Sequence, residues 1–161
     1  MKLLGVLALW LGISAYQTRG HVPSGAAAAP AFTLTDLTGR EVSLAEYAGR
    51  RVVLHFFATW CGVCKAELPS LRAVHSGLAR DEALLAIVAD AEDLEQVRRF
   101  AAEHELTYPI LLATEEVLRA YGVDRFPTNY YLNGDGSVST SSTGLSTWLG
   151  MRARLFFASN R

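Results

Sequence analysis

Cys61 and Cys64 are the residues of this sequence whose type and spacing most clearly suggest chemistry. They are the only cysteines among 161 residues. A C-x-x-C pair can cycle between dithiol and disulfide, supply half of a zinc site, or bind Cu(I) through its thiolates. A purely structural disulfide is a weaker alternative, because a bridge that closes so short a loop removes little entropy from the unfolded chain.

Zinc binding is disfavoured, because a structural zinc site needs four ligands. The sequence has no second C-x-x-C and no H-x-x-x-H pair among its histidines, which are His21, His55, His75 and His104. Copper is the stronger metal alternative, since Cys61, Cys64 and a histidine folded over them could hold Cu(I). We expect redox chemistry with no resident metal or other cofactor, and keep a copper-binding carrier as the alternative.

The pair lies between a predicted strand and a predicted helix. Residues 52–57 are apolar, β-branched or aromatic apart from His55, which is typical of a strand buried on both faces of a parallel sheet. After Trp60, apolar residues recur at helical spacing, at Leu68, Leu71, Val74 and Leu78. Because the N–H groups and dipole of a helix N-terminus favour an anion, Cys61 is placed to react as a thiolate.

These residues resemble the active site of the thioredoxin superfamily. The motif is Trp60-Cys61-Gly62-Val63-Cys64, with Pro69 five residues later. The flanking Phe57-Ala58-Thr59-Trp60 and Glu67-Leu68-Pro69 narrow the resemblance to exported, membrane-tethered or periplasmic thiol–disulfide oxidoreductases of the TlpA/ResA type. Thioredoxin has proline where this chain has Val63, and its relatives usually have Asp or Asn at His55. The resemblance covers nearly all of residues 31–161.

The resemblance implies roles for further residues. Glu67 lies three residues after Cys64, on the same helical face, and the TlpA/ResA group carries a functional glutamate there. In Phe126-Pro127-Thr128, the proline matches a family proline that is cis, lies beside the cysteines and leaves the preceding backbone free to pair with a peptide. Substrate binding is therefore expected at these three residues. Trp60 either shapes the substrate surface or simply covers the helix start.

His55 occupies the position where thioredoxin holds a buried carboxylic acid thought to move the proton of the second cysteine. Burial lowers the pKa of histidine and raises that of a carboxyl, so the two can reach a similar proton affinity. A neutral His55 could accept the Cys64 proton directly or through a water, with Glu67 stabilising the imidazolium. The alternative is a packed histidine whose nitrogens are satisfied by backbone or water.

The N-terminus predicts export. Lys2 precedes an apolar run over residues 3–15, with the small residues Ser14 and Ala15 near a candidate cleavage site. The run is shorter than the roughly 20 residues that span a bilayer comfortably, so a cleaved signal, an uncleaved anchor and an ordinary core helix all stay open. We expect a signal peptide or membrane anchor (1–20), a linker (21–30) and a thioredoxin-like domain (31–161), periplasmic or otherwise extracytoplasmic.

Charge and resemblance together limit the partners. A net charge of −1 with 19% charged residues gives no basis for nucleic-acid binding, and membrane contact is expected only through the N-terminal segment. The resemblance implies client proteins with disulfides and a membrane thiol-transporting reductase as electron donor, with c-type cytochrome maturation as one such task. A disulfide-forming oxidant stays an alternative. A peroxiredoxin-like peroxidase is disfavoured because its Pro-x-x-x-Thr-x-x-Cys context is absent.

The remaining pattern predicts an α/β, thioredoxin-like fold, with a central mixed β-sheet flanked by helices and an N-terminal β-hairpin. The expected strands after the hairpin (32–37 and 41–44) are 52–57, 83–89, 108–112, 129–132 and 137–143. The expected helices follow the cysteines and cover 92–104, 115–121 and 146–158, the last being apolar at Trp148, Leu149, Leu155 and Phe156.

Overall fold

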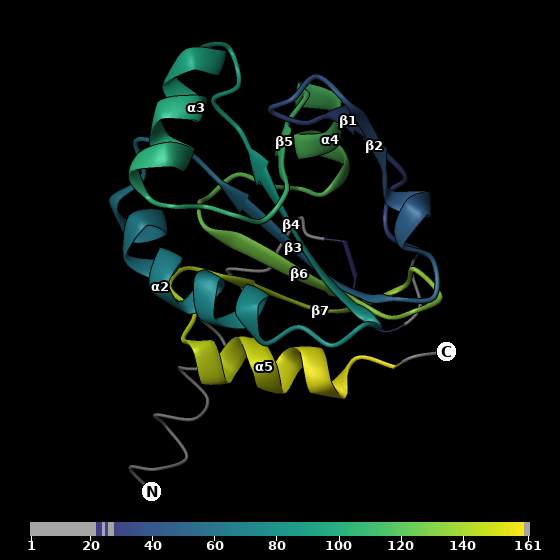
Figure 1. Ribbon diagram of the computed structural model, residues 1–161. Coiled ribbons are helices and arrows are strands. Elements are labelled where there is room, and N and C mark those ends of the chain that lie inside the picture. Colours follow the sequence, from purple (N-terminus) through teal and green to yellow (C-terminus); the bar gives the residue numbers. More distant parts are fainter. Residues whose placement is uncertain (1–21, 24, 26–27, 160–161) are drawn as a thin grey trace, which may run out of the picture.

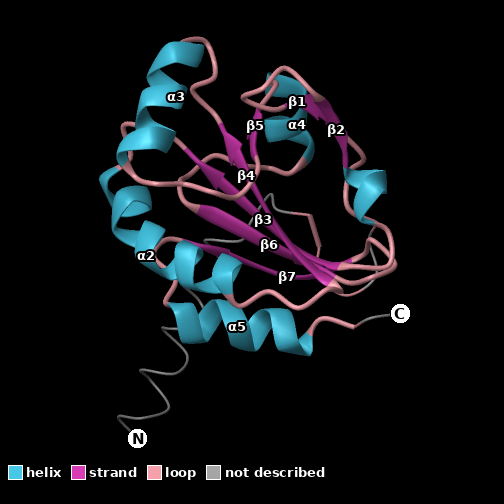
Figure 2. Ribbon diagram, in the orientation of Figure 1, coloured by secondary structure: helices cyan, strands magenta, loops and turns pink. Residues whose placement is uncertain are grey.

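A mixed five-stranded sheet forms the centre of the molecule (Figures 1 and 2). The structure, a computed structural model, describes residues 22–23, 25 and 28–159. The strand order is β5 (Ile110–Leu112), β4 (Glu82–Val88), β3 (Arg51–Phe57), β6 (Thr128–Leu132) and β7 (Val138–Thr143). β3, β4 and β5 are parallel, whereas β6 is antiparallel to both β3 and β7. The predicted mixed α/β architecture is confirmed.

Different elements cover the two faces of this sheet (Figure 1). Three helices pack on one face: α2 (Gly62–Ser76), α3 (Leu94–Glu103) and α5 (Trp148–Phe157). The other face is covered by α4 (Glu115–Ala120) and by the antiparallel pair β1 (Thr33–Thr35) and β2 (Glu41–Ser43), followed by the 3-10 helix η1 (Leu44–Tyr47). The predicted N-terminal hairpin is therefore present, as a separate two-stranded sheet.

The central strand β3 sends side chains into both cores. Val53 and Phe57 pack with α2, α3 and α5, whereas Leu54 and Phe56 pack with α4 and the β1–β2 pair. Because side chains alternate along a strand, His55 points to the same side as Val53 and Phe57. The only polar residue between Val52 and Phe57 thus faces α2, the helix that carries the cysteines.

The final helix packs differently from what its sequence suggests. Met151 and Leu155 are its buried residues. Of the four apolar residues singled out in the sequence, Leu155 is buried, but Trp148, Leu149 and Phe156 are exposed. The helix is apolar on its outer side as well as its inner side, so the pattern of hydrophobic residues does not identify the face that the sheet covers.

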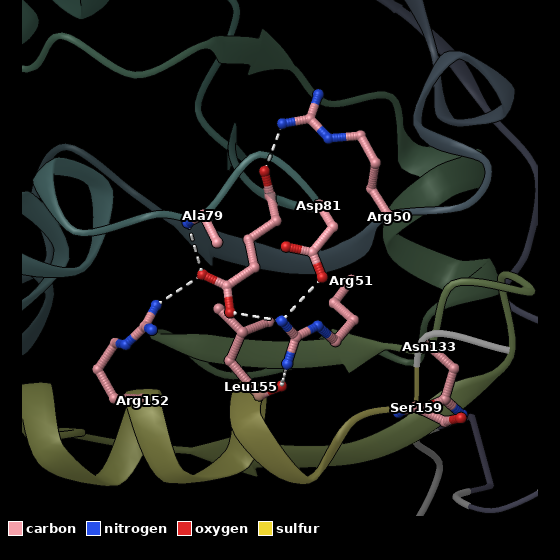
Figure 3. Close-up of polar contacts among 9 residues, drawn as sticks. Arg50, Arg51, Ala79, Asp81, Asn133, Arg152, Leu155 and Ser159 are labelled. Carbon is pink, nitrogen blue, oxygen red and sulfur yellow. Dashed lines mark hydrogen bonds and ion pairs between the residues drawn. The ribbon is translucent and has the colours of Figure 1, made fainter.

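An ion cluster holds α5 against the start of β3 and β4 (Figure 3). Glu82 is 2% exposed, and its carboxylate lies 3.0 Å from Arg51 Nη2 and 2.8 Å from Arg152 Nη1. The Ala79 N–H also donates to it, and Arg51 donates to the Leu155 carbonyl. A buried carboxylate is tolerated when it is paired and hydrogen-bonded in this way. The cluster lies at the end of β3 that is remote from the cysteines.

The predicted signal or anchor, residues 1–20, lies outside the described residues. In the part of the chain that is described, no helix combines the length and hydrophobicity that crossing a membrane requires. The described residues of the predicted linker contact the domain: the Val22 N–H donates to the Tyr130 hydroxyl, and Ala28 forms a β-bridge with Ser137.

Candidate active site

Cys61 and Cys64 lie at the start of α2, where β3 has just ended. Cys61 is the N-cap of the helix, Cys64 lies in its first turn, and the two are joined by a disulfide with a Cα–Cα distance of 5.2 Å. The Cys61 sulfur accepts a hydrogen bond of 3.1 Å from the Cys64 backbone N–H. That N–H is one of the donors a helix start leaves without an intrahelical partner, so it stabilises negative charge on Cys61.

The two cysteines differ in their surroundings. Cys64 is fully buried, whereas Cys61 retains 6% exposure and lies next to Trp60, which is 68% exposed. Val63, between the cysteines, is also exposed. Cys61 is therefore the cysteine that an incoming disulfide can reach.

The loop before β6 lies beside this helix start. Its Phe126–Pro127 peptide bond is cis, as the resemblance implies. The Phe126 ring packs edge-on against Trp60, with ring centroids 6.0 Å apart. Thr128 is buried, and its hydroxyl donates to the Arg125 carbonyl. Trp60 is therefore exposed and contacts this loop, and its role in shaping a substrate surface stays a prediction.

Beneath α2, three buried side chains form a hydrogen-bonded set that we call the polar cluster: His55 on β3, Glu67 on α2 and Asn129 on β6. All three are fully buried. His55 Nδ1 lies 2.8 Å from Asn129 Oδ1 and 3.4 Å from Glu67 Oε2. Glu67 Oε1 accepts hydrogen bonds from Asn129 Nδ2, at 3.3 Å, and from the backbone N–H of Ser146, at 2.7 Å.

The position of the polar cluster follows from strand register and helix spacing. His55 lies directly opposite Asn129 in the antiparallel pairing of β3 with β6. Glu67 lies one helical turn after Cys64 in α2, so the cluster occupies the same layer as Cys64, between helix and sheet. The structure brings together His55 and Glu67, the two residues proposed from the sequence.

Asn129 and the backbone N–H of Ser146 were not identified from the sequence. A signal for Asn129 existed, since it is a polar residue in a predicted buried strand, two positions after the proline assigned to the site. For Ser146, which precedes the last helix, no comparable local signal existed.

Burial shifts the pKa values of the two titratable members of the polar cluster in opposite directions. It lowers the pKa of His55 to about 4, against the opposing effect of the Asn129 hydrogen bond. It raises the pKa of Glu67 to about 7, although the hydrogen bonds from Ser146 and Asn129 act against this change. Near pH 7 the imidazole is therefore neutral, and the Glu67 carboxyl is close to its midpoint, as a group that exchanges protons at that pH should be.

A sequence model of the AhpC/TSA family matches residues 26–141. The chain belongs to this family. This AhpC/TSA protein is 34% identical over 158 residues to the thioredoxin-like protein YneN of Bacillus subtilis, covering 95% of this chain and 93% of YneN. It is 36% identical over 120 residues to the thiol-disulfide oxidoreductase ResA of Geobacillus thermodenitrificans, covering 74% of this chain and 69% of that protein.

A solved structure of a thiol:disulfide interchange protein, of the thioredoxin family and from Chlorobium tepidum, is also similar. Its TM-score is 0.75 at 25% sequence identity, with 85% of this chain and 99% of that chain covered. With the C-x-x-C pair at the start of α2, these relatives show that this AhpC/TSA family member is an enzyme, a thiol–disulfide oxidoreductase of the ResA type. Among residues 22–23, 25 and 28–159, no group of three His, Cys, Asp or Glu side chains could hold a metal ion.

Proposed function

We propose that this oxidoreductase reduces disulfides of client proteins outside the cytoplasm. One observation supports the reductive direction. In the disulfide form, the hydrogen bond to the Cys61 sulfur comes from the backbone N–H of Cys64, and no Lys, Arg or His side chain among the described residues donates to this sulfur. Strong oxidants such as DsbA owe their potential to a heavily stabilised reduced form. A less stabilised thiolate leaves a dithiol that gives up its electrons more readily.

The proposed cycle begins with the dithiol. The Cys61 thiolate attacks one sulfur of a client disulfide, which forms a mixed disulfide and releases one client thiolate. Cys64, once deprotonated, attacks the Cys61 sulfur, and the second client thiolate leaves as the Cys61–Cys64 disulfide forms. Two electrons have then passed to the client, and each of its sulfurs takes up one proton.

The second step needs a proton acceptor inside the protein, because Cys64 is fully buried. The polar cluster supplies one in our proposal. Neutral His55 takes the Cys64 proton, directly or through a water, and the Glu67 carboxyl 3.4 Å from its ring stabilises the imidazolium. Glu67 itself, with a pKa raised to about 7, is a second group able to take up the proton near neutral pH.

Client binding is assigned to the surface around Cys61. The exposed indole of Trp60 and the ring of Phe126 would contact the client, and the cis-proline loop, Phe126 to Thr128, would align its backbone beside the disulfide. A largely apolar surface of this kind suits clients that differ in sequence, because burial of apolar surface is non-directional.

The extracytoplasmic location rests on the N-terminal sequence, residues 1–20, which we assign to a signal peptide or a membrane anchor. In an oxidising compartment a cysteine pair is oxidised by default, so a reductase there needs a dedicated electron donor, for which a membrane thiol-transporting reductase is our candidate. Maturation of c-type cytochromes is one task that such a system serves. Cell fractionation should find the protein outside the inner membrane, and a cytoplasmic pool that retains Met1 would contradict this location.

The equilibrium reduction potential of Cys61–Cys64 tests whether the protein reduces or forms client disulfides. A reductase should have a potential below about −200 mV, close to the value of about −270 mV for thioredoxin. A potential near that of DsbA, about −120 mV, would instead assign the protein as a disulfide-forming oxidant.

A further inference from the structure

We infer that Asn129 is a positioning residue for disulfide exchange: it holds His55 in the tautomer protonated at Nδ1, which leaves Nε2 as the proton-accepting atom. The inference rests on the proposed role of His55 in taking the Cys64 proton. The tautomer itself can be measured without turnover, so the two ideas can fail separately.

The direction of the hydrogen bonds in the polar cluster is set at Ser146. Its backbone N–H can only donate, so Glu67 Oε1, at 2.7 Å, is an acceptor. Asn129 Nδ2 lies 3.3 Å from the same oxygen and donates to it. The other end of the amide, Oδ1, then faces His55 Nδ1 at 2.8 Å. Because an amide oxygen only accepts, Nδ1 must carry the hydrogen.

The reversed amide gives a poorer set of contacts. Asn129 Oδ1 would then face Glu67 Oε1, and two acceptors would meet in a fully buried site. A proton on Oε1 could relieve that contact, but only while Glu67 is protonated. Above the pKa of Glu67, about 7, the carboxylate has no proton to give, and only the first orientation satisfies the amide at both ends.

The hydrogen-bonded chain ends at His55 Nε2. Among the described residues, this atom and Glu67 Oε2 are buried and have no hydrogen-bond partner. The ring is held by stacking on Phe57, with ring centroids 5.4 Å apart and an angle of 14° between the rings. A buried nitrogen with an unused lone pair is costly. The ring lies on the same side of β3 as Val53 and Phe57, which belong to the core cluster that also contains Cys64.

The segments next to Pro127, the proline expected to contact the client, also position the two groups that donate to Glu67, Asn129 Nδ2 and the Ser146 backbone N–H. Asn129 follows Pro127 by two residues in β6, and the Pro127 carbonyl accepts a hydrogen bond of 2.8 Å from Gly144, two residues before Ser146. The orientation of His55 is thereby tied to the backbone that is expected to contact the client.

Other titratable groups near the polar cluster do not change charge in the range of a thiol assay. Tyr108, Tyr131 and Arg154 interact electrostatically with Glu67. Burial raises the pKa of both tyrosines, that of Tyr131 to about 12, so they stay neutral throughout the pH range of a thiol assay. A change in the pH profile therefore reports on His55, Glu67 or the cysteines.

The first test is nitrogen NMR of labelled histidine in the oxidised full-length protein, at about pH 9, above the pKa of Glu67. We expect His55 Nδ1 to carry the proton, and Nε2 to show the chemical shift of an unprotonated ring nitrogen. The opposite assignment would overturn the inference even in a fully active enzyme, and this measurement needs no variant to fold.

The second test compares Asn129→Ala with Asn133→Ala. Asn133 follows the same strand and also makes two side-chain hydrogen bonds, to Ser137 and from Ser159, but lies outside the polar cluster. In Asn129→Ala, His55 should lose its preference for the Nδ1-protonated tautomer. Resolution of the mixed disulfide should slow about tenfold or more, since a positioned base contributes about 10²–10⁴-fold. The pH profile of this step should also shift. Asn133→Ala should change none of these.

The outcomes separate the inference from the proposed function. A folded Asn129→Ala protein with the wild-type tautomer and pH profile would overturn the inference. An enzyme that shows the predicted tautomer but exchanges no disulfides would overturn the proposed function, and with it the role of Asn129 in exchange.

Discussion

His55 and Glu67 face each other in the core, with Nδ1 and Oε2 3.4 Å apart and both side chains fully buried. Burial favours the uncharged form of each, so between pH 4.5 and 6.5 the folded pair holds its proton on the carboxyl. In the unfolded chain, the imidazole holds a proton over the same range and the carboxyl has lost its own. The pair therefore binds the same number of protons in the folded and unfolded states. Its contribution to the free energy of unfolding should change little between pH 4.5 and 6.5.

When Glu67 is replaced, the titration of His55 should make the stability of the fold depend on pH. In Glu67→Gln, the native state binds fewer protons than the unfolded state between pH 4 and 6.5, because the pKa of His55 is lowered. Stability relative to wild type should therefore rise with pH across this window, by up to about 3 kcal/mol. Urea unfolding of both proteins at several pH values measures this difference, and a level difference curve would show that the two pKa values are not shifted as the structure indicates.

His55 should be replaceable by an amide but not by a hydrocarbon. We expect His55→Asn, which introduces a residue usual among relatives, to keep the fold and much of the activity, whereas His55→Leu slows resolution of the mixed disulfide because the proton acceptor is lost. Combining His55→Leu with Glu67→Gln should be worse than either change alone. Stopped-flow reduction of a model disulfide from about pH 5 to 9 measures this. If His55→Leu matches wild type at every pH, the histidine only packs.

Trp60 should matter for clients more than for chemistry. Trp60→Ala removes an exposed ring that contacts Phe126, so we expect KM for a protein disulfide to rise several-fold while the reaction with a small aromatic disulfide is nearly unchanged. Phe157→Ala, at the far end of α5, is the matched control for loss of an exposed aromatic ring. Equal effects on both substrates would assign Trp60 to the structure of the helix start instead.

The ion cluster at Glu82 should contribute to stability without affecting the redox chemistry. Glu82→Gln removes the buried carboxylate that pairs with Arg51 and Arg152, although Arg51 keeps its ion pair with Asp81, and should destabilise the fold by about 1–3 kcal/mol. The reduction potential should stay at its wild-type value, because Glu82 lies at the opposite end of the sheet from the cysteines. Glu115→Gln, which breaks an exposed pair with Arg119, should change stability little in the same urea titrations. A shift in potential for Glu82→Gln would disprove this separation.

Features that depend on neighbouring residues could be predicted from the sequence. The buried strand over residues 52–57, the cysteines at its junction with a helix, and the position of Glu67 one turn later all follow from local patterns, and the structure has each of them. The cis peptide bond before Pro127 came from resemblance, since no local pattern distinguishes it from a trans bond.

Features that depend on long-range register could not be predicted in the same way. His55 meets Asn129 across 74 residues, and Glu67 meets the N–H of Ser146 across 79. Each contact requires a particular strand register or loop path, which side-chain periodicity does not specify. Which side of α5 is exposed could not be predicted either, because Trp148 and Leu149 are apolar, like the residues that the helix buries.

The most direct test of the account is a trapping experiment with the full-length Cys64→Ser protein. Its Cys61, once reduced, should attack the disulfide of a client such as insulin and stay bound, because no second thiol remains to resolve the mixed disulfide. We predict an adduct that forms in proportion to reduced Cys61, is cleaved by dithiothreitol, and is absent from Cys61→Ser. If no thiol-cleavable adduct forms while Cys61 is shown to be free and accessible, the proposed attack of Cys61 on client disulfides is contradicted.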